Sequence, residues 1–172
     1  LDFSDASFDL VNARFIFGVL PRTAWPPFIT ECTRLVRPGG ILRITEVIDG
    51  FSSSAAFEQW NIWLHQALYQ IGYGFSSTGY SINVTTVLPS LLRQAGYHDV
   101  RYVSSTLDSS ANTTTWADGY RGVEIAMHLS EPLLVRVGLT TKDELHRLIT
   151  RFQIEARSEN FCLMQHNLTV WG

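Results

Sequence analysis

The chain has 172 residues, of which 45% are hydrophobic and 17% are charged, and 13 Lys and Arg against 16 Asp and Glu give a net charge of −3 at pH 7. This composition excludes a disordered chain, and it lacks the basic excess that is typical of nucleic-acid-binding proteins. Two cysteines are too few for a disulfide scaffold, the sequence contains no membrane-spanning apolar run, and its first five residues lack the charged and apolar regions that are typical of a signal peptide.

The first part of the chain predicts a strand, a helix and a second strand. Residues 8–17 are β-rich and almost continuously apolar, which is typical of a strand covered on both faces. Apolar residues at helical spacing predict a helix over 24–37, with Thr23 as its N-cap. The Pro-Gly-Gly sequence at 38–40 ends this helix, and residues 41–48 predict the second strand. Two strands joined by one helix are expected to run parallel.

The rest of the chain predicts further helices and strands. Helical spacing and capping residues favour the helices, and β-rich composition favours the strands. The expected helices cover residues 52–71, 84–95, 116–128 and 133–139, with one more opened by the capping box Thr141–Glu144, and the expected strands cover 99–106 and 161–171. The helices over 116–128 and 133–139 are expected to be joined near Ser130-Glu131-Pro132.

Five segments resemble the class I S-adenosylmethionine-dependent methyltransferases. They are Leu1–Val11 (LDFSDASFDLV), Arg34–Gly40 (RLVRPGG), Glu46 at a strand end, Leu91–Tyr97 (LLRQAGY) and Leu168–Gly172 (LTVWG). They follow the family's order and spacing over essentially the whole chain. The resemblance implies an α/β fold with part of a Rossmann-like sheet flanked by helices. Of the family's strand order 3-2-1-4-5-7-6, this chain would supply strands four to seven, the last one antiparallel.

The sequence also departs from the family. The glycine-rich cofactor loop and the acidic ribose-binding strand end, which should precede Leu1, are absent, and no G-x-G-x-x-G occurs. We therefore expect a single, partial methyltransferase domain over residues 1–172, in a cytoplasmic protein without a membrane or nucleic-acid partner. Its first strand would have an unpaired edge. Either a homodimer or the missing N-terminal segment is expected to cover that edge.

The resemblance implies S-adenosylmethionine as the cofactor. Ligands of open α/β sheets lie beyond the carboxyl ends of the strands. The residues implied are Asn12, Ala13 and Arg14 for the methionine part, and Leu1, Asp2 and Phe3 for the region of the adenine. For Asn12 and Arg14, the alternative is a capping role within a loop.

Methyl transfer from a sulfonium is a direct displacement, for which proximity and alignment supply much of the catalysis. A hydroxyl acceptor additionally needs a base, and Glu46 and His65 are the candidates. The alternatives are a solvated strand-end carboxylate and a structural histidine. Aromatic residues near the expected mouth indicate a small, partly apolar methyl acceptor. The aromatic candidates are Trp63, Tyr69, Tyr73 and Phe75. No histidine or cysteine has metal-ligand spacing.

Two other functions remain open from the sequence. The chain could be a non-catalytic or partner-dependent fragment that associates through its exposed sheet edge. It could also be another Rossmann-type enzyme, such as a nicotinamide oxidoreductase. The antiparallel strand expected over residues 161–171 argues against the second alternative.

Overall fold

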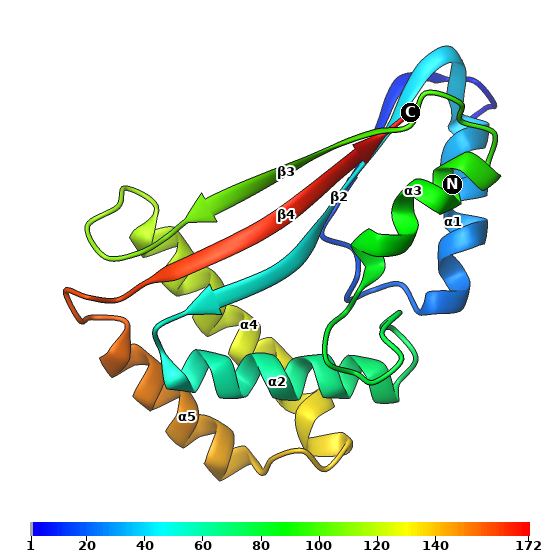
Figure 1. Cartoon of the computed structure of the whole chain (residues 1–172). Coiled ribbons are helices and arrows are strands. Elements are labelled where there is room, and N and C mark those ends of the chain that lie inside the picture. Colours follow the sequence, from blue (N-terminus) through cyan, green and yellow to red (C-terminus); the bar gives the residue numbers. More distant parts are fainter. Residues whose placement is uncertain (1) are drawn as a thin grey trace.

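The computed structural model describes residues 2–172 as one mixed sheet with helices packed against it (Figure 1). The strands are β1 (Phe8–Arg14), β2 (Val36–Ser52), β3 (Arg101–Asp108) and β4 (Leu163–Trp171). The helices are the short 3₁₀ turn η1 (Arg22–Ala24), α1 (Trp25–Leu35), α2 (Ala55–Gln70), α3 (Val84–Gln94), α4 (Trp116–Arg136) and α5 (Lys142–Glu155).

The strand order in the sheet is β1-β2-β4-β3. β1 and β2 are parallel, whereas β4 runs antiparallel to both β2 and β3. The expected order 4-5-7-6 with an antiparallel closing strand is therefore confirmed, as is the α/β fold class. The antiparallel strand lies inside the sheet, so the chain's last segment joins β2 to β3.

The β1–α1–β2 unit differs in detail from the prediction. Thr23 lies in η1, and Ala24 is the N-cap of α1 without a capping side chain, so the predicted N-cap is wrong. The two prolines of the first turn fit as expected, because their missing N–H groups have no partner in a helix start. β2 begins at Val36, directly after α1, and Gly39 takes a φ of +78° within it. The helix thus ends before the Pro-Gly-Gly sequence, which lies within β2, so the predicted helix end at residue 37 and the predicted strand start at residue 41 are wrong.

One further prediction is wrong, because the helices expected over 116–128 and 133–139 are a single helix, α4. Pro132 lies inside it. The buried side chains Met127, Ser130 and Leu134 hold this helix in place on both sides of the proline. The Trp60 Nε1–H of α2 donates to Ser130 Oγ at 2.9 Å. Tertiary packing therefore outweighs the backbone hydrogen bond that proline removes.

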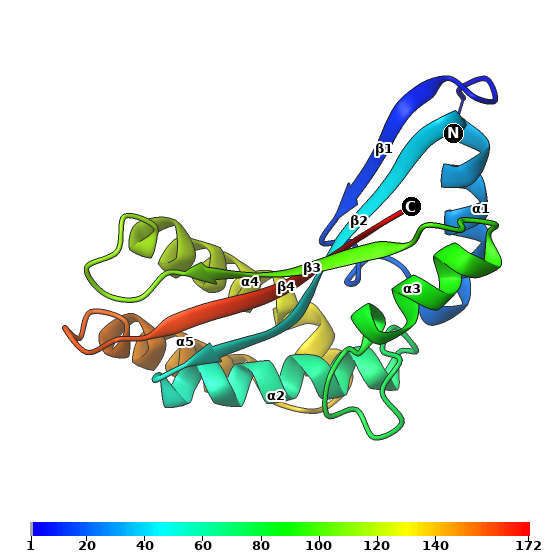
Figure 2. The ribbon, with the colours of Figure 1, turned by 45° about the horizontal axis from the view of Figure 1, so that its top comes forward.

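The helices lie in two groups at different ends of the sheet, with α1 and α3 at one end and α2, α4 and α5 at the other (Figures 1 and 2). Each group forms its own apolar cluster. One joins α1 and α3 to β1, β2 and β4, with Trp25 and Leu88 fully buried. The other lies among α2, α4 and α5 at the far end of the sheet, with Phe152 at its centre. β4 contributes to both clusters, through Val170 to the first and Leu163 to the second. β2 contributes Leu42 and Ile44 to the first cluster, and its last residues extend beyond the end of β1 to contact α2.

The two edge strands differ in exposure. Every residue of β3 is exposed, and β1 pairs with β2 alone within residues 2–172. Leu10 of β1 is 47% exposed.

Within residues 2–172, no helix has both the length and the apolar character needed to span a membrane.

Candidate functional site

The carboxyl ends of β1 and β2 define one end of the sheet. β1 stops at Arg14, which pairs with Thr45, while β2 continues to Ser52. A register shift between Val47 and Asp49 marks an irregularity in β2 just beyond this point. Such an irregularity re-aims the side chains that follow it. Residues after β1 and on the second half of β2 are thus brought together.

Three residues are expected near the methionine part of the cofactor, and the side chains of two of them are exposed at this end of the sheet. Asn12 and Arg14 are exposed on one face of β1, and Ala13, which points to the other face, is half-buried. The Asn12 Oδ1 accepts from Arg43 Nε at 2.7 Å. The Arg14 guanidinium lies over the Phe15 ring, 5.1 Å from its centroid. An amide and a guanidinium therefore flank the end of the strand.

The residues expected near the adenine lie elsewhere. Leu1 is outside the described residues. Phe3 packs edge-on against Phe8, the first residue of β1, and its carbonyl accepts from Arg34 at 2.8 Å. Asp2 is next to it and exposed. Asp2 and Phe3 are thus at the amino end of β1, and the structure does not bring them together with Arg14.

Glu46 is buried rather than solvated at an open rim. Its side chain is 0% exposed, because β2 continues past it and the turn after β1 covers it. Its Oε1 accepts from the Ile16 N–H at 2.8 Å. Its Oε2 is buried without a hydrogen-bond partner among the described residues. Burial raises the pKa of the Glu46 carboxyl to about 7, although the backbone N–H groups of Ile16 and Phe17 act in the opposite direction.

His65 belongs to a polar cluster between α2 and β2. The ring is 6% exposed, and its Nδ1 lies 3.1 Å from the Tyr80 carbonyl oxygen. A carbonyl only accepts, so Nδ1 carries the proton in this contact. Its Nε2 faces Asp49 Oδ1 at 4.0 Å. That oxygen also accepts from the Asn61 amide at 3.0 Å and from the Gly50 N–H at 2.7 Å.

Asp49 and Asn61 are site residues that the sequence reasoning missed. A signal was available for both. Asp49 directly follows the predicted strand over residues 41–48, at the end of the sheet where ligands bind. Asn61 precedes His65 by four positions, so the two share one face of α2.

The four aromatic candidates do not form one wall. Tyr73 and Phe75 pack with the α1 and α3 cluster, and Phe75 meets Trp25 at a ring distance of 6.4 Å. Tyr69 is 42% exposed and donates to the Ser77 carbonyl at 3.3 Å. Trp63 lies two residues from His65 and therefore points to a different side of α2.

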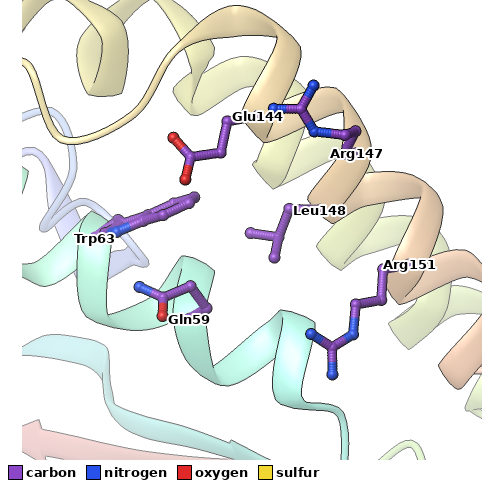
Figure 3. Close-up of a pocket in the computed structure, with 6 residues that line it drawn as sticks. All are labelled: Gln59, Trp63, Glu144, Arg147, Leu148 and Arg151. Atoms are coloured by element: carbon purple, nitrogen blue, oxygen red, sulfur yellow. The ribbon is translucent and has the colours of Figure 1, made fainter.

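Trp63 borders a hollow of about 320 Å³ between α2 and α5 (Figure 3). Figure 3 shows Trp63 and Gln59 on one side, facing Glu144 and Leu148 on the other. Arg147 and Arg151 complete the lining. A second hollow of about 280 Å³ lies between α2 and the loop that contains Tyr80. It is lined by Ile62, Gln66, Thr78, Gly79 and Tyr80.

Neither cysteine offers an evident reactive site. Cys32 is 3% exposed, and burial raises the pKa of its thiol to about 11. Cys162 is half-buried, and its sulfur accepts from the Ser110 hydroxyl. The structure, over residues 2–172, groups no three His, Cys, Asp or Glu side chains in a way that could hold a metal ion.

One family model matches part of the chain. A family model described as a methyltransferase domain matches residues 1–44, which include β1, α1 and the first part of β2. Over these residues, the match confirms the resemblance to methyltransferases that the sequence motifs indicated. No curated protein sequence matches the chain.

Several solved structures are similar to the chain at low sequence identity. A phosphoethanolamine N-methyltransferase 2 of Haemonchus contortus, in complex with S-adenosylhomocysteine, is 15% identical with a TM-score of 0.44, covering 98% of this chain and 34% of its own. A protein of Bacillus halodurans described as a methyltransferase is 13% identical with a TM-score of 0.44, covering 99% and 71%. The [4+2]-cyclase SpnF is 19% identical with a TM-score of 0.40, covering 98% and 52%. The chain spans about a third of the length of the first of these.

Proposed function

We propose that this chain, a relative of the class I S-adenosylmethionine-dependent methyltransferases, serves the transfer of a methyl group to a small, partly apolar molecule. The observation that carries the proposal is the β1–α1–β2 unit matched by the methyltransferase-domain model. The antiparallel strand β4 between β2 and β3 supports it, because this arrangement is not expected of a nicotinamide oxidoreductase. The methyl transfer, the cofactor and the acceptor are all part of what we propose.

The residues at the end of β1 fit the methionine part of the cofactor. That part carries a carboxylate, which a guanidinium such as that of Arg14 can bind. The Asn12 side chain is held in one orientation by Arg43, which reduces the entropy lost on binding a ligand. When bound, S-adenosylmethionine supplies an electrophilic methyl group. We do not extend the assignment to Asp2 and Phe3, which lie at the other end of the strand.

We assign the methyl acceptor to the side of α2 that carries His65. Tyr69 follows His65 by four positions on the same face of the helix. The neighbouring hollow between α2 and the Tyr80 loop combines apolar Ile62 with polar Gln66 and Thr78, which suits a partly apolar molecule. Most of the catalysis would come from positioning.

His65 is the residue that would take up the acceptor's proton. The Tyr80 carbonyl holds its Nδ1–H, so Nε2 is the nitrogen left to act as a base. Asp49, at 4.0 Å from Nε2, would stabilise the imidazolium that forms. We give no direct role in proton transfer to Glu46, because its carboxyl group is covered by protein.

A second candidate function is a non-catalytic fragment that associates through its sheet edge. The observation that favours it is the outer edge of β1, which has no partner strand within the described part of the chain. Exposed Leu10 on this strand adds apolar surface to that edge. Such an edge can pair with another chain.

Calorimetric titration of S-adenosylmethionine and S-adenosylhomocysteine into the chain tests both candidates. Micromolar binding of either ligand is expected if the end of β1 holds the cofactor. Absence of binding at millimolar ligand, together with a dimer in light scattering, would favour the associating fragment and contradict cofactor binding by this chain.

A further inference from the structure

The turn that follows β1 is held by two consecutive residues of β2. The Phe15 N–H donates to the Thr45 carbonyl at 2.9 Å, and the Ile16 N–H donates to Glu46 Oε1 at 2.8 Å. Phe15 has a φ of +55°, a conformation that non-glycine residues rarely adopt. A residue persists in this conformation only where its surroundings enforce it. Thr45 and Glu46 supply that constraint at the point where the chain leaves the sheet.

The same turn encloses the Glu46 carboxyl group. The Val19 and Leu20 N–H groups close it by donating to the Ile16 carbonyl at 3.0 and 3.2 Å. Glu46 is 0% exposed under this turn, with one oxygen unpartnered among residues 2–172. An ionised carboxylate in such a place keeps its backbone hydrogen bond from Ile16, but its second oxygen is left without the hydrogen bond that it requires. Water can reach it only if the turn moves away from β2.

We propose that Glu46 is a positioning residue, which in its protonated form holds the turn at residues 15–20 against β2 and so fixes the shape of the adjacent segment Asn12–Arg14. Loss of the proton releases the turn, because the buried carboxylate then gains by contact with water. The part of this inference that concerns cofactor affinity rests on the proposed function. The part that concerns the turn does not.

Other charged groups on the elements that pack against β2 are either engaged with other partners or exposed. Arg14 of β1 lies over Phe15, and His65 of α2 faces Asp49 of β2. The His166 Nδ1 of β4 lies 3.0 Å from the Thr106 hydroxyl. The helices that pack against β2 carry four more charged side chains. Glu31 and Arg34 of α1 pair with each other. Arg93 of α3 and Glu58 of α2 are exposed. Burial raises the pKa of Glu46 to about 7, so the release would fall in the neutral range.

The test is a pH titration of the Ile16 and Phe17 amide signals by NMR, without any ligand. In the unmodified chain, both signals are expected to shift with a midpoint near pH 7. Glu46→Gln keeps an acceptor oxygen but cannot ionise, so it should abolish the transition. Glu159→Gln, at an exposed position, is the matched control and should leave it unchanged. A midpoint near the ordinary value of a glutamate, or the same transition in Glu46→Gln, would overturn the proposal.

Calorimetry with S-adenosylhomocysteine at about pH 6 and about pH 8.5 separates this inference from the proposed function. Affinity is expected to fall roughly fivefold or more at the higher pH, and to stay constant in Glu46→Gln. An amide transition without any binding would leave the positioning role intact and contradict cofactor binding. Binding without an amide transition would support cofactor binding and contradict the positioning role of Glu46. The unmodified chain alone decides both outcomes if the variant does not fold.

Discussion

Ser54 and Glu155, 101 positions apart, join the start of α2 to the end of α5: the Ser54 hydroxyl donates to Glu155 Oε2 at 2.6 Å. The same hydroxyl oxygen accepts from the Phe57 N–H, and the same carboxylate accepts from the Ala56 N–H at 3.1 Å. Two free N–H groups of the first turn of α2 are thereby satisfied. The helix that carries His65 is thus anchored at its N-terminus by a distant helix.

Replacing Ser54 by Ala removes this cap and the link to Glu155. We expect a loss of about 1–2 kcal/mol in the free energy of unfolding, because both the helix cap and a charge-assisted hydrogen bond disappear. Urea denaturation followed by circular dichroism measures this loss. The matched control is Ser77→Ala, at an exposed loop position. Equal stability of the two variants would show that the cap contributes nothing.

The hydrogen bond from Trp60 to Ser130 predicts a second stability effect. In Ser130→Ala the buried indole N–H would lose its acceptor, at a cost of about 1–3 kcal/mol. In Trp60→Phe with Ser130→Ala, the N–H donor and its acceptor are both absent. A double-mutant cycle should therefore give a coupling energy of about 1 kcal/mol. Strict additivity of the two changes would contradict this hydrogen bond.

Pro132→Ala is expected to stabilise the protein. The proline is exposed inside α4 and leaves the helix without one backbone donor, which alanine would restore. The gain should be about 1–2 kcal/mol after the greater freedom of the unfolded chain is subtracted. Pro26→Ala, in the first turn of α1, restores no helical hydrogen bond and should show no gain. The unfolding temperatures of the two variants provide the comparison.

The buried Glu46 predicts a dependence of stability on pH. Its pKa in the folded protein, about 7, lies above the ordinary value of 4.5, so the folded state binds the proton more tightly than the unfolded chain. This contribution is complete below about pH 4.5 and is lost as the pH rises through about 7, and it amounts to about 3 kcal/mol at most. As the pH rises over this range, the urea concentration at the midpoint of unfolding should fall in the unmodified chain. It should fall less steeply in Glu46→Gln. Parallel declines would contradict the prediction.

Arg14→Ala tests the assignment of the cofactor site. Removal of the guanidinium should weaken S-adenosylhomocysteine binding about tenfold or more, because a charge-assisted contact to the carboxylate is lost. Arg136→Ala, at an exposed position at the end of α4, is the control and should bind normally. Unchanged affinity in Arg14→Ala would remove this residue from the proposed site.

Local patterns in the sequence were sufficient for most of the secondary structure. The apolar spacing in α1 and the Thr141 cap of α5 are short-range features, and both are present in the structure. The order of the strands followed from the family resemblance and is also confirmed. The exceptions, Thr23 and Pro132, are places where packing or a preceding turn outweighs local preference.

Periodicity in the sequence by itself determined the α/β class and the parallel pairing of β1 with β2, and the motifs in order along the chain supplied the resemblance that implied an antiparallel closing strand. Only the tertiary structure decided which candidate side chains meet. It buried Glu46 under the turn after β1, placed Phe3 at the amino end of that strand, and brought Asp49 next to His65. The physical reason is that the exposure and the partners of a side chain depend on segments far away in the sequence, which no local pattern encodes.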